Sequence, residues 1–299
     1  MSAGTRDGVL PAGFHWPDGI RAAAAFTFDV DAESGVLAAD PSAARRASVM
    51  SHQAYGPRTG VPRLLRVLDR QRIRATFFVP GYTAERWPDA IRSIRDAGHE
   101  IGHHGYLHEQ VAGLDPEAEE RLLIRGLEAL DMVAGVRPIG WRAPMWEASW
   151  SSPSILARHG FRYDSSLMDA DHPYRLAAPS AGAPDATIVE LPIQWALDDW
   201  EQYVYLPDLS GSGVIQSPGH VVETWRAELD AMVEAGGSFI LTNHPFASGR
   251  PSRAAALEDL IEHAGRIDGL WIAALDEICA HVESLALDPV VPRPVTVEP

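Results

Sequence analysis

The 299-residue sequence has one cysteine, few basic residues relative to its acids and no long hydrophobic run. Cys279 cannot form an intramolecular disulfide, and its apolar neighbours predict a small buried side chain, with a catalytic role as the alternative. No stretch approaches the roughly twenty apolar residues of a membrane span. The apolar run at 22–28 is too short for a signal peptide and lies too close to acidic residues. We therefore expect a cytoplasmic protein that does not associate with membranes.

The charge balance narrows the range of partners. Only 25 basic residues stand against 41 acidic ones, which gives a formal net charge of -16. A field of this sign repels polyanions, so nucleic acid and highly anionic polymers are not expected partners. A neutral or cationic substrate fits this charge better.

Strand-like and helix-like segments alternate along most of the chain. This pattern predicts an α/β fold in which helices cover parallel strands, as a barrel or a wound sheet. We expect one domain with a core at about 22–285 and irregular tails at 1–20 and 288–299. Strands are expected at 22–29, 75–79, 100–102, 139–141, 161–163, 187–191, 239–242 and 270–273, and helices at 62–70, 90–97, 115–133, 151–159, 219–235, 254–266 and 275–287.

Residues 34–60 have no clear period and contain Gly, Pro and Ser, so they predict a long irregular excursion. Loops of this length inside compact domains usually form lids or contact surfaces. The segment is therefore expected to lie over a functional site or in a contact between subunits.

Four histidines and two glutamates occur at 99–109, in the order H-E-I-G-H-H-G-Y-L-H-E. Imidazole is the commonest transition-metal ligand, and the spacing of His104 and His108 predicts two rings on one face of a helical turn. The alternative is a polar, solvated turn. His99 is expected to end the preceding turn, and His103 to lie behind the ligands or face solvent.

Polar residues follow five of the predicted strands. Functional groups gather at the carboxyl ends of parallel strands in both barrels and wound sheets. We therefore expect the following residues to lie together at one end of the fold: Asp29 and Asp31, His104 and His108, Arg142, Asp164, and His244.

The order of these motifs resembles the polysaccharide deacetylase family, whose domain is also called the NodB-homology domain. The matching segments are F-T-F-D-V-D at 26–31, H-H-G-Y-L-H at 103–108, W-R-A-P at 141–144, D-S-S-L at 164–167 and L-T-N-H-P at 241–245. The resemblance implies a distorted (β/α) barrel of the NodB type with about seven parallel strands. By the same resemblance, a homo-oligomer is expected.

Two departures place the resemblance in one branch of the family. Val30 separates the two aspartates of the first motif, and Gly105 stands where Ser or Thr usually follows the first metal histidine. Together with the segment at 190–200, these changes resemble the branch that contains peptidoglycan deacetylase homologues, cyclic imide hydrolases and allantoinase-like proteins. That branch is not confined to polysaccharides.

The chemistry of the residues predicts their roles. Asp31, His104 and His108 make a site with two nitrogens and one oxygen that leaves positions open, as a catalytic divalent ion requires. Zinc is the expected ion, with cobalt, nickel or manganese as alternatives. Asp29 is the expected general base and His244 the general acid.

The resemblance adds two partners to this set. It implies that Arg142 orients the base and that Asp164 holds the acid in its protonated form. A guanidinium favours an ionised carboxyl group, and a carboxylate raises the pKa of a histidine. Each of these residues also has an ordinary structural interpretation as a cap, a turn residue or a core ion pair.

Aromatic residues are the predicted walls of the pocket. Trp146, Trp195, Trp200 and Tyr55 are expected to contact substrate, with core packing as the alternative for each tryptophan. Taken together, the sequence predicts a metal-dependent hydrolase of non-peptide carbon–nitrogen bonds, acting as an N-deacetylase through a metal-activated water on a small neutral or amide-bearing substrate. The alternatives are a small-molecule amidohydrolase, of the cyclic imide hydrolase or allantoinase type, and a catalytically silent barrel that binds metal or glycan.

Overall fold

A curled sheet of nine strands forms the centre of the computed structural model, which describes residues 10–206 and 214–293. The strands are β1 (Ala22–Asp29), β2 (Thr76–Val79), β3 (Glu100–His103), β4 (Gly140–Trp141), β5 (Tyr163–Asp164), β6 (Tyr174–Ala177), β7 (Thr187–Glu190), β8 (Ser238–Asn243) and β9 (Leu270–Ile272). Their order is β6-β7-β5-β4-β3-β2-β1-β8, and β9 also pairs with β1. An isolated bridge between Asp198 and Thr242 joins the segment after β7 to β8, so the curl is completed without a regular ladder.

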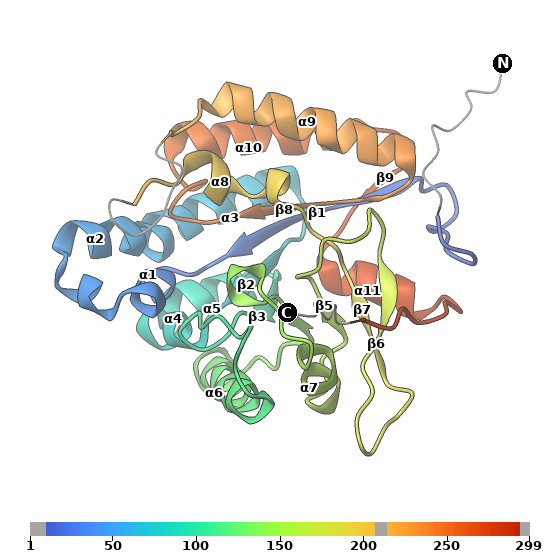
Figure 1. Cartoon of the computed structure of the whole chain (residues 1–299). Helices are drawn as coiled ribbons and strands as arrows, with labels where there is room; N and C mark the ends of the chain where they lie inside the picture. Colours follow the sequence, from blue (N-terminus) through green and yellow to red (C-terminus); the bar gives the residue numbers. More distant parts are fainter. Residues whose placement is uncertain (1–9, 207–213, 294–299) are drawn as a thin grey trace, which may run out of the picture.

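Helices cover the outside of the sheet (Figure 1). They are α1 (Ser34–Ala39), α2 (Ala47–Tyr55), α3 (Val61–Gln71), α4 (Gly81–Arg86), α5 (Pro88–Asp96), α6 (Pro116–Ala134), α7 (Ser152–Arg158), α8 (Asp199–Tyr203), α9 (Pro218–Ala235), α10 (Pro251–Ala264) and α11 (Leu275–Glu283). Helices α9 and α10 lie together over β8 and β1, whereas α4 to α7 lie on the other side of the molecule. None of the described helices is long and apolar enough to cross a membrane.

This architecture confirms the predicted distorted (β/α) barrel. All pairings are parallel except that of β6 with β7, which is antiparallel. The sequence did not predict β6, because this four-residue edge strand gives too short a pattern to recognise. Helix α6 begins as predicted, since the side chain of Asp115 accepts a hydrogen bond from the Ala118 amide and Pro116 takes the first helical position.

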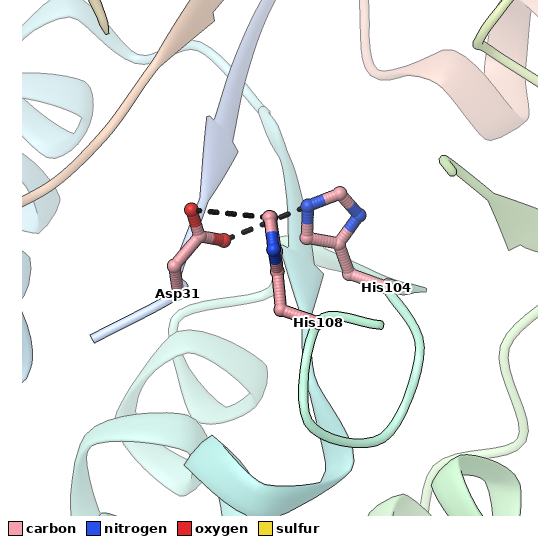
Figure 2. A group of neighbouring side chains, drawn as sticks. All are labelled: Asp31, His104 and His108. Carbon is pink, nitrogen blue, oxygen red and sulfur yellow. Dashed lines mark ion pairs between the residues drawn. The ribbon is translucent and has the colours of Figure 1, made fainter. Parts of the chain in front are cut away.

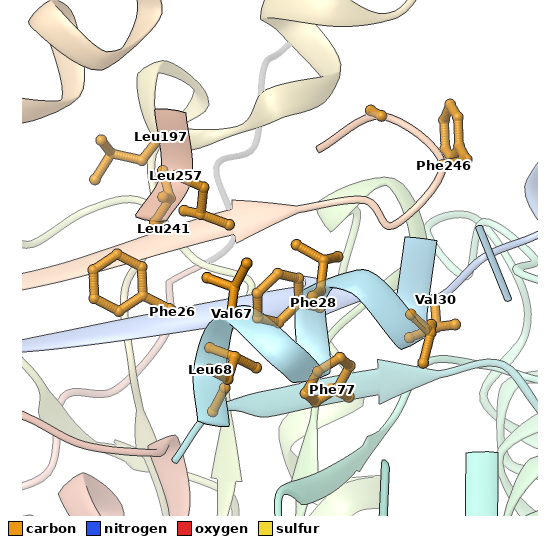
Figure 3. Packing of buried hydrophobic residues seen from close by; sticks show 14 of the residues in the cluster. Phe26, Phe28, Val30, Val67, Leu68, Phe77, Leu197, Leu241, Phe246 and Leu257 are labelled. Carbon is orange, nitrogen blue, oxygen red and sulfur yellow. The ribbon is translucent and has the colours of Figure 1, made fainter. Parts of the chain in front are cut away.

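The sheet separates two hydrophobic clusters. Strand β1 is buried along its whole length, and its successive side chains point to opposite faces. Phe26 and Phe28 pack outward with Val67 and Leu68 of α3, in what we call the outer cluster (Figure 3). Burial of each phenylalanine stabilises the fold by roughly 1.5–3 kcal/mol.

The opposite faces of the strands enclose the inner cluster, which fills the inside of the curl. Ala23 and Ala25 of β1 contribute to it together with Phe78, Tyr163 and Ile240. The two alanines leave room there for the larger rings from neighbouring strands. The inner cluster therefore supports the site from below, at the amino side of the strand ends.

Residues 34–60 are not the irregular excursion that the sequence predicted. They form α1, a short 3₁₀ helix (Pro41–Arg45), α2 and a π-helical turn (Gly56–Gly60). The turn packs against the loop after β8, where a Cβ atom on Gly60 would stand 2.0 Å from the carbonyl oxygen of Pro245. Because helices of five to nine residues have weak periodicity, the sequence did not reveal them.

The described parts of the predicted tails, 10–20 and 288–293, are irregular but partly packed. Phe14 and Trp16 are buried in the inner cluster, and Val290 forms a bridge with Leu176 of β6. The remaining parts of the predicted tails, 1–9 and 294–299, lie outside the described residues.

The close approach of Gly60 to Pro245 generates a prediction. Replacement of Gly60 by alanine must displace the backbone that follows His244, so we expect a loss of about 1–3 kcal/mol in the free energy of unfolding. Urea unfolding of Gly60→Ala measures this loss. Gly182→Ala is the control, because no atom lies within 4 Å of a Cβ at that position. Equal stability of Gly60→Ala and wild type would contradict the packing described here.

Candidate functional site

The alternation of side chains along the strands sets which residues reach the inside. Asp29 ends β1 on the same face as Ala23 and Ala25, so its carboxylate points into the curl above the inner cluster. The same alternation applies to β8, where Ile240 faces the inner cluster and His244 follows four residues later. Both side chains are at most 5% exposed.

Strand β3 divides the neighbouring histidines between its two faces. His104 points inward, above Gly102, where a Cβ atom would clash with the ring of Phe78. His103 points outward, where its Nε2 lies 3.1 Å from the carbonyl oxygen of Leu123. His103 is fully buried, so it is not exposed to solvent, and burial lowers its pKa to about 4. Because its ring points away from Asp31, it does not belong to the group of possible metal ligands.

Asp31, His104 and His108 converge on one point (Figure 2). The His104 Nε2 atom lies 3.5 Å from Asp31 Oδ1, and His108 Nε2 lies 3.6 Å from Asp31 Oδ2. The spacing of the two histidines had predicted a helical turn, and this prediction is wrong. The pair lies in a loop, in which Gly105 has φ +73° and His108 has φ +62°, and this left-handed backbone turns the second ring toward the first.

These three side chains fit a divalent metal ion. Two ligands about 2.0–2.2 Å from one tetrahedral ion stand roughly 3.3–3.6 Å apart, which agrees with the separations observed. Asp31 Oδ1 is buried and has no hydrogen-bond partner, which is costly unless a cation occupies the space beside it. His104 Nδ1 lies 2.8 Å from the carbonyl oxygen of Arg142, so Nε2 is left with a free lone pair.

Arg142 binds the oxygen of Asp29 that does not face His104. Its Nη1 donates to Asp29 Oδ1 at 2.9 Å and to the Thr27 hydroxyl at 2.9 Å. The guanidinium is fully buried, donates also to Ser165 and lies 4.3 Å from the centre of the Phe78 ring. Asp29 Oδ2 remains free of Arg142 and lies 3.8 Å from His104 Nε2. The predicted pairing of Arg142 with Asp29 is therefore present.

His244 approaches the ligands from the other side. Its Nε2 lies 3.5 Å from Asp31 Oδ2, and its Nδ1 lies 2.7 Å from Asp199 Oδ1. Asp199 also accepts hydrogen bonds from the backbone amide of His244 and from Ser248. Burial alone lowers the pKa of His244, but the carboxylates of Asp198, Asp199 and Asp31 outweigh it and raise the pKa well above 6.5.

The structure contradicts the expected pairing of Asp164 with His244. Tyr163 faces the inner cluster, so its neighbour Asp164 points to the opposite face of β5. There it lies in register with Glu190 of β7 and accepts a hydrogen bond from Ser166. Burial raises the pKa of Asp164 to about 7. Burial, together with the charge of Asp164, raises the pKa of Glu190 well above its usual value, so the pair holds a proton between them.

Asp198 and Asp199 are the site residues that sequence reasoning missed. They begin α8 and lie between two tryptophans in the segment W-A-L-D-D-W, which follows a strand. The sequence signal that could have identified them is a pair of adjacent acids in an aromatic segment that follows a strand. Burial raises the pKa of Asp198 to about 8, although the charge of His244 opposes this. Asp199 is the nearer of the two acids, because its Oδ1 lies 2.7 Å from His244 Nδ1 whereas Oδ1 of Asp198 lies 3.5 Å away.

A pocket of about 210 Å³ opens over the ligands and His244. It is smaller than the roughly 300–1,000 Å³ of pockets for drug-sized ligands. Trp146 and Trp195 stack with ring centroids 4.5 Å apart, and the ring of Trp200 lies 5.2 Å from that of His244. The apolar residues that line the pocket are Val36, Ala39, Met145, Trp146, Trp195, Trp200 and Leu206.

Tyr55, which was predicted to bind substrate, does not line this pocket. Its hydroxyl bonds to Arg63 and to the Gly249 carbonyl, and Arg250 stacks on its ring at 3.6 Å. Tyr55 supports the loop after β8. Its position on the packed face of α2 could not be read from an unperiodic segment.

Comparison with known proteins decides the family. The profile described as polysaccharide deacetylase matches residues 45–163. The peptidoglycan deacetylase of Helicobacter pylori is 30% identical over 275 residues, which cover 85% of this chain and 94% of that protein. The chain belongs to the polysaccharide deacetylase family. Its motifs had indicated the same family.

Solved structures of this family and its branch have the same fold. A polysaccharide deacetylase homologue from Mycobacterium smegmatis is 55% identical, with 96% of this chain and 99% of that chain covered and a TM-score of 0.92. The PuuE allantoinase is 25% identical, with 92% and 94% covered and a TM-score of 0.76. As a member of the polysaccharide deacetylase family, the protein is a hydrolase of carbon–nitrogen bonds other than peptide bonds.

The contact between Asp199 and His244 predicts how activity depends on pH. If His244 acts as an acid, activity is present while His244 is protonated and is lost as the pH rises through its raised pKa. Asp199→Asn removes a charge that raises this pKa, so the loss begins at a lower pH, and kcat/KM falls by about 100-fold.

The pH profile of kcat/KM checks this prediction, and Asp164→Asn is the matched control. Because Asp164 faces away from His244, its variant is expected to keep the alkaline limb of the wild-type profile. The assignment is wrong if Asp164→Asn moves this limb and Asp199→Asn does not.

Proposed function

We propose that the protein is a metal-dependent N-deacetylase-type amide hydrolase. Asp31, His104 and His108 would hold the ion, with Asp29 as general base and His244 as general acid. One observation carries the proposal: Asp29 and His244 approach the ligand group from two sides, with Asp29 Oδ2 3.8 Å from His104 and His244 Nε2 3.5 Å from Asp31. A site that only binds metal has no use for this arrangement.

The donor set favours zinc, with cobalt, nickel or manganese as alternatives, because two imidazoles and one carboxylate are common ligands of these ions. When bound, such an ion polarises the amide carbonyl and lowers the pKa of water. The three ligands and both proposed proton-transfer groups come from the ends of β1, β3 and β8, so folding brings them together before substrate arrives.

Two side chains of the protein would accept and donate the protons of the reaction. Arg142 donates a hydrogen bond to Asp29 Oδ1, which leaves Oδ2 to accept a proton from the attacking water. His244 has its Nδ1 bonded to Asp199, so its protonated Nε2 faces the site and can donate to the leaving nitrogen. One residue takes a proton as the bond to carbon forms, and the other gives one as the carbon–nitrogen bond breaks.

The pocket supports a second candidate, a small-molecule amidohydrolase of the cyclic imide hydrolase or allantoinase type. Trp195 and Trp200 narrow the space above His244, and the lining is mostly apolar. An enclosed aromatic pocket suits a compact neutral amide, whereas a long glycan chain needs an open groove. The similarity to the PuuE allantoinase supports the same candidate.

Metal content and activity of two variants test the proposed roles. We expect His104→Ala to lose bound metal, because it removes one of three ligands. Asp29→Asn is expected to keep the wild-type metal content and to lose activity by about 10²–10⁴-fold, because it removes only the base. Elemental analysis of the purified proteins measures the metal. Full metal retention by His104→Ala would refute this ligand set.

Two substrates separate the candidate functions. The metal-loaded protein is assayed for acetate release from an acetylated chitooligosaccharide and for ring opening of succinimide. The deacetylase proposal predicts acetate release, and the second candidate predicts turnover of the imide alone. Turnover of neither substrate, nor of any other amide, would leave a catalytically silent barrel that binds metal or glycan.

A further inference from the structure

Acidic groups supply all the formal charge on the pocket wall apart from the histidines. Asp29, Asp31, Asp198 and Glu201 line the pocket, and no arginine of the described residues does. The sequence contains no lysine that might take its place. The nearest buried cation, Arg142, lies behind Asp29 and is already bonded to it.

Three of these acids have basic side chains beside them, but Glu201 has none among the described residues. Asp29 is paired with Arg142, Asp31 faces the three histidines of the site, and Asp198 lies 3.5 Å from His244 Nδ1. Glu201 is exposed on α8 and makes no hydrogen bond or ion pair with the described part of the chain. Its carboxylate therefore projects an uncompensated negative charge at the pocket, next to Trp200.

We propose that Glu201 determines specificity by charge, so that the site takes neutral amides and discriminates against substrates that carry a carboxylate beside the scissile bond. This inference rests on the proposed function of the same site. His244, the protonated side chain of the pocket wall, is already paired with Asp199, and no arginine among the described lining residues is available to neutralise such a carboxylate. A substrate anion therefore meets the Glu201 charge without a counter-charge from the protein.

The size of the effect follows from the exposure of Glu201. An exposed charge acts through water and salt, so its influence corresponds to a few-fold change in affinity. We expect Glu201→Gln to improve the use of an anionic substrate by about threefold relative to its neutral analogue, and Glu201→Arg to improve it by about tenfold. Salt shortens the range of the interaction, so the differences shrink at high ionic strength.

Two matched pairs of probes isolate charge from shape. One is N-acetylmuramic acid and its methyl ester, which differ chiefly in the carboxylate. The other is hydantoin-5-acetic acid and its methyl ester. The kcat/KM ratio within each pair is measured for wild type, Glu201→Gln and Glu201→Arg. Glu128→Gln is the control, because Glu128 is an exposed acid on α6 that does not line the pocket.

Binding of the same pairs is measured by calorimetry on the full chain, whether or not the compounds are hydrolysed. The inference is supported if wild type prefers the ester and the two Glu201 variants reduce this preference while Glu128→Gln does not. It is overturned if the acid-to-ester ratios of both Glu201 variants equal that of wild type. Absence of hydrolysis would count against the proposed function alone, since the binding ratios still decide the role of Glu201.

Discussion

The alternation of side chains along short parallel strands is the constraint on which the site depends. Because successive residues face opposite sides of the sheet, Asp29, His104 and His244 reach the interior only if their strands keep one register. A slip of one residue in β3 would exchange His104 for His103. The rings of Phe78 and Tyr163 in the inner cluster hold that register. They leave room only for a residue without a side chain at Gly102, where a Cβ atom would clash with Phe78.

Burial of several charges in one place creates an electrostatic problem that the fold resolves in three ways. Arg142 neutralises Asp29 directly, and the Asp199–His244 pair forms a second compensated unit. Asp164 and Glu190 retain a proton on the outer face, at a distance from the reaction. Asp31 is left with an unpartnered oxygen, and a divalent ion is the group that would satisfy it. Asp31, which the fold leaves without a partner at one oxygen, is thus the acid available to bind the proposed ion.

Much of the site could be predicted from the sequence, because its residues follow recognisable strands in a fixed order. The three proposed metal ligands and the Asp29–Arg142 pair lie together as that order indicated. The partner of His244 could not be found in this way, because Asp199 lies 45 residues before it and on a helix whose position depends on how the curl closes. The loop conformation at His108 was also hidden, because the spacing of two histidines does not distinguish a helical turn from a left-handed bend.

A crystal structure of the zinc-loaded protein, with anomalous scattering recorded at the zinc edge, tests the central claim most directly. We expect one ion bonded at about 2.0–2.2 Å to Asp31, His104 Nε2 and His108 Nε2, with Asp29 and His244 nearby but not bonded. An ion bonded instead to Asp198, Asp199 and His244, the second cluster that could hold a metal, would contradict it. Absence of any anomalous peak at Asp31 in zinc-loaded crystals would contradict it as well.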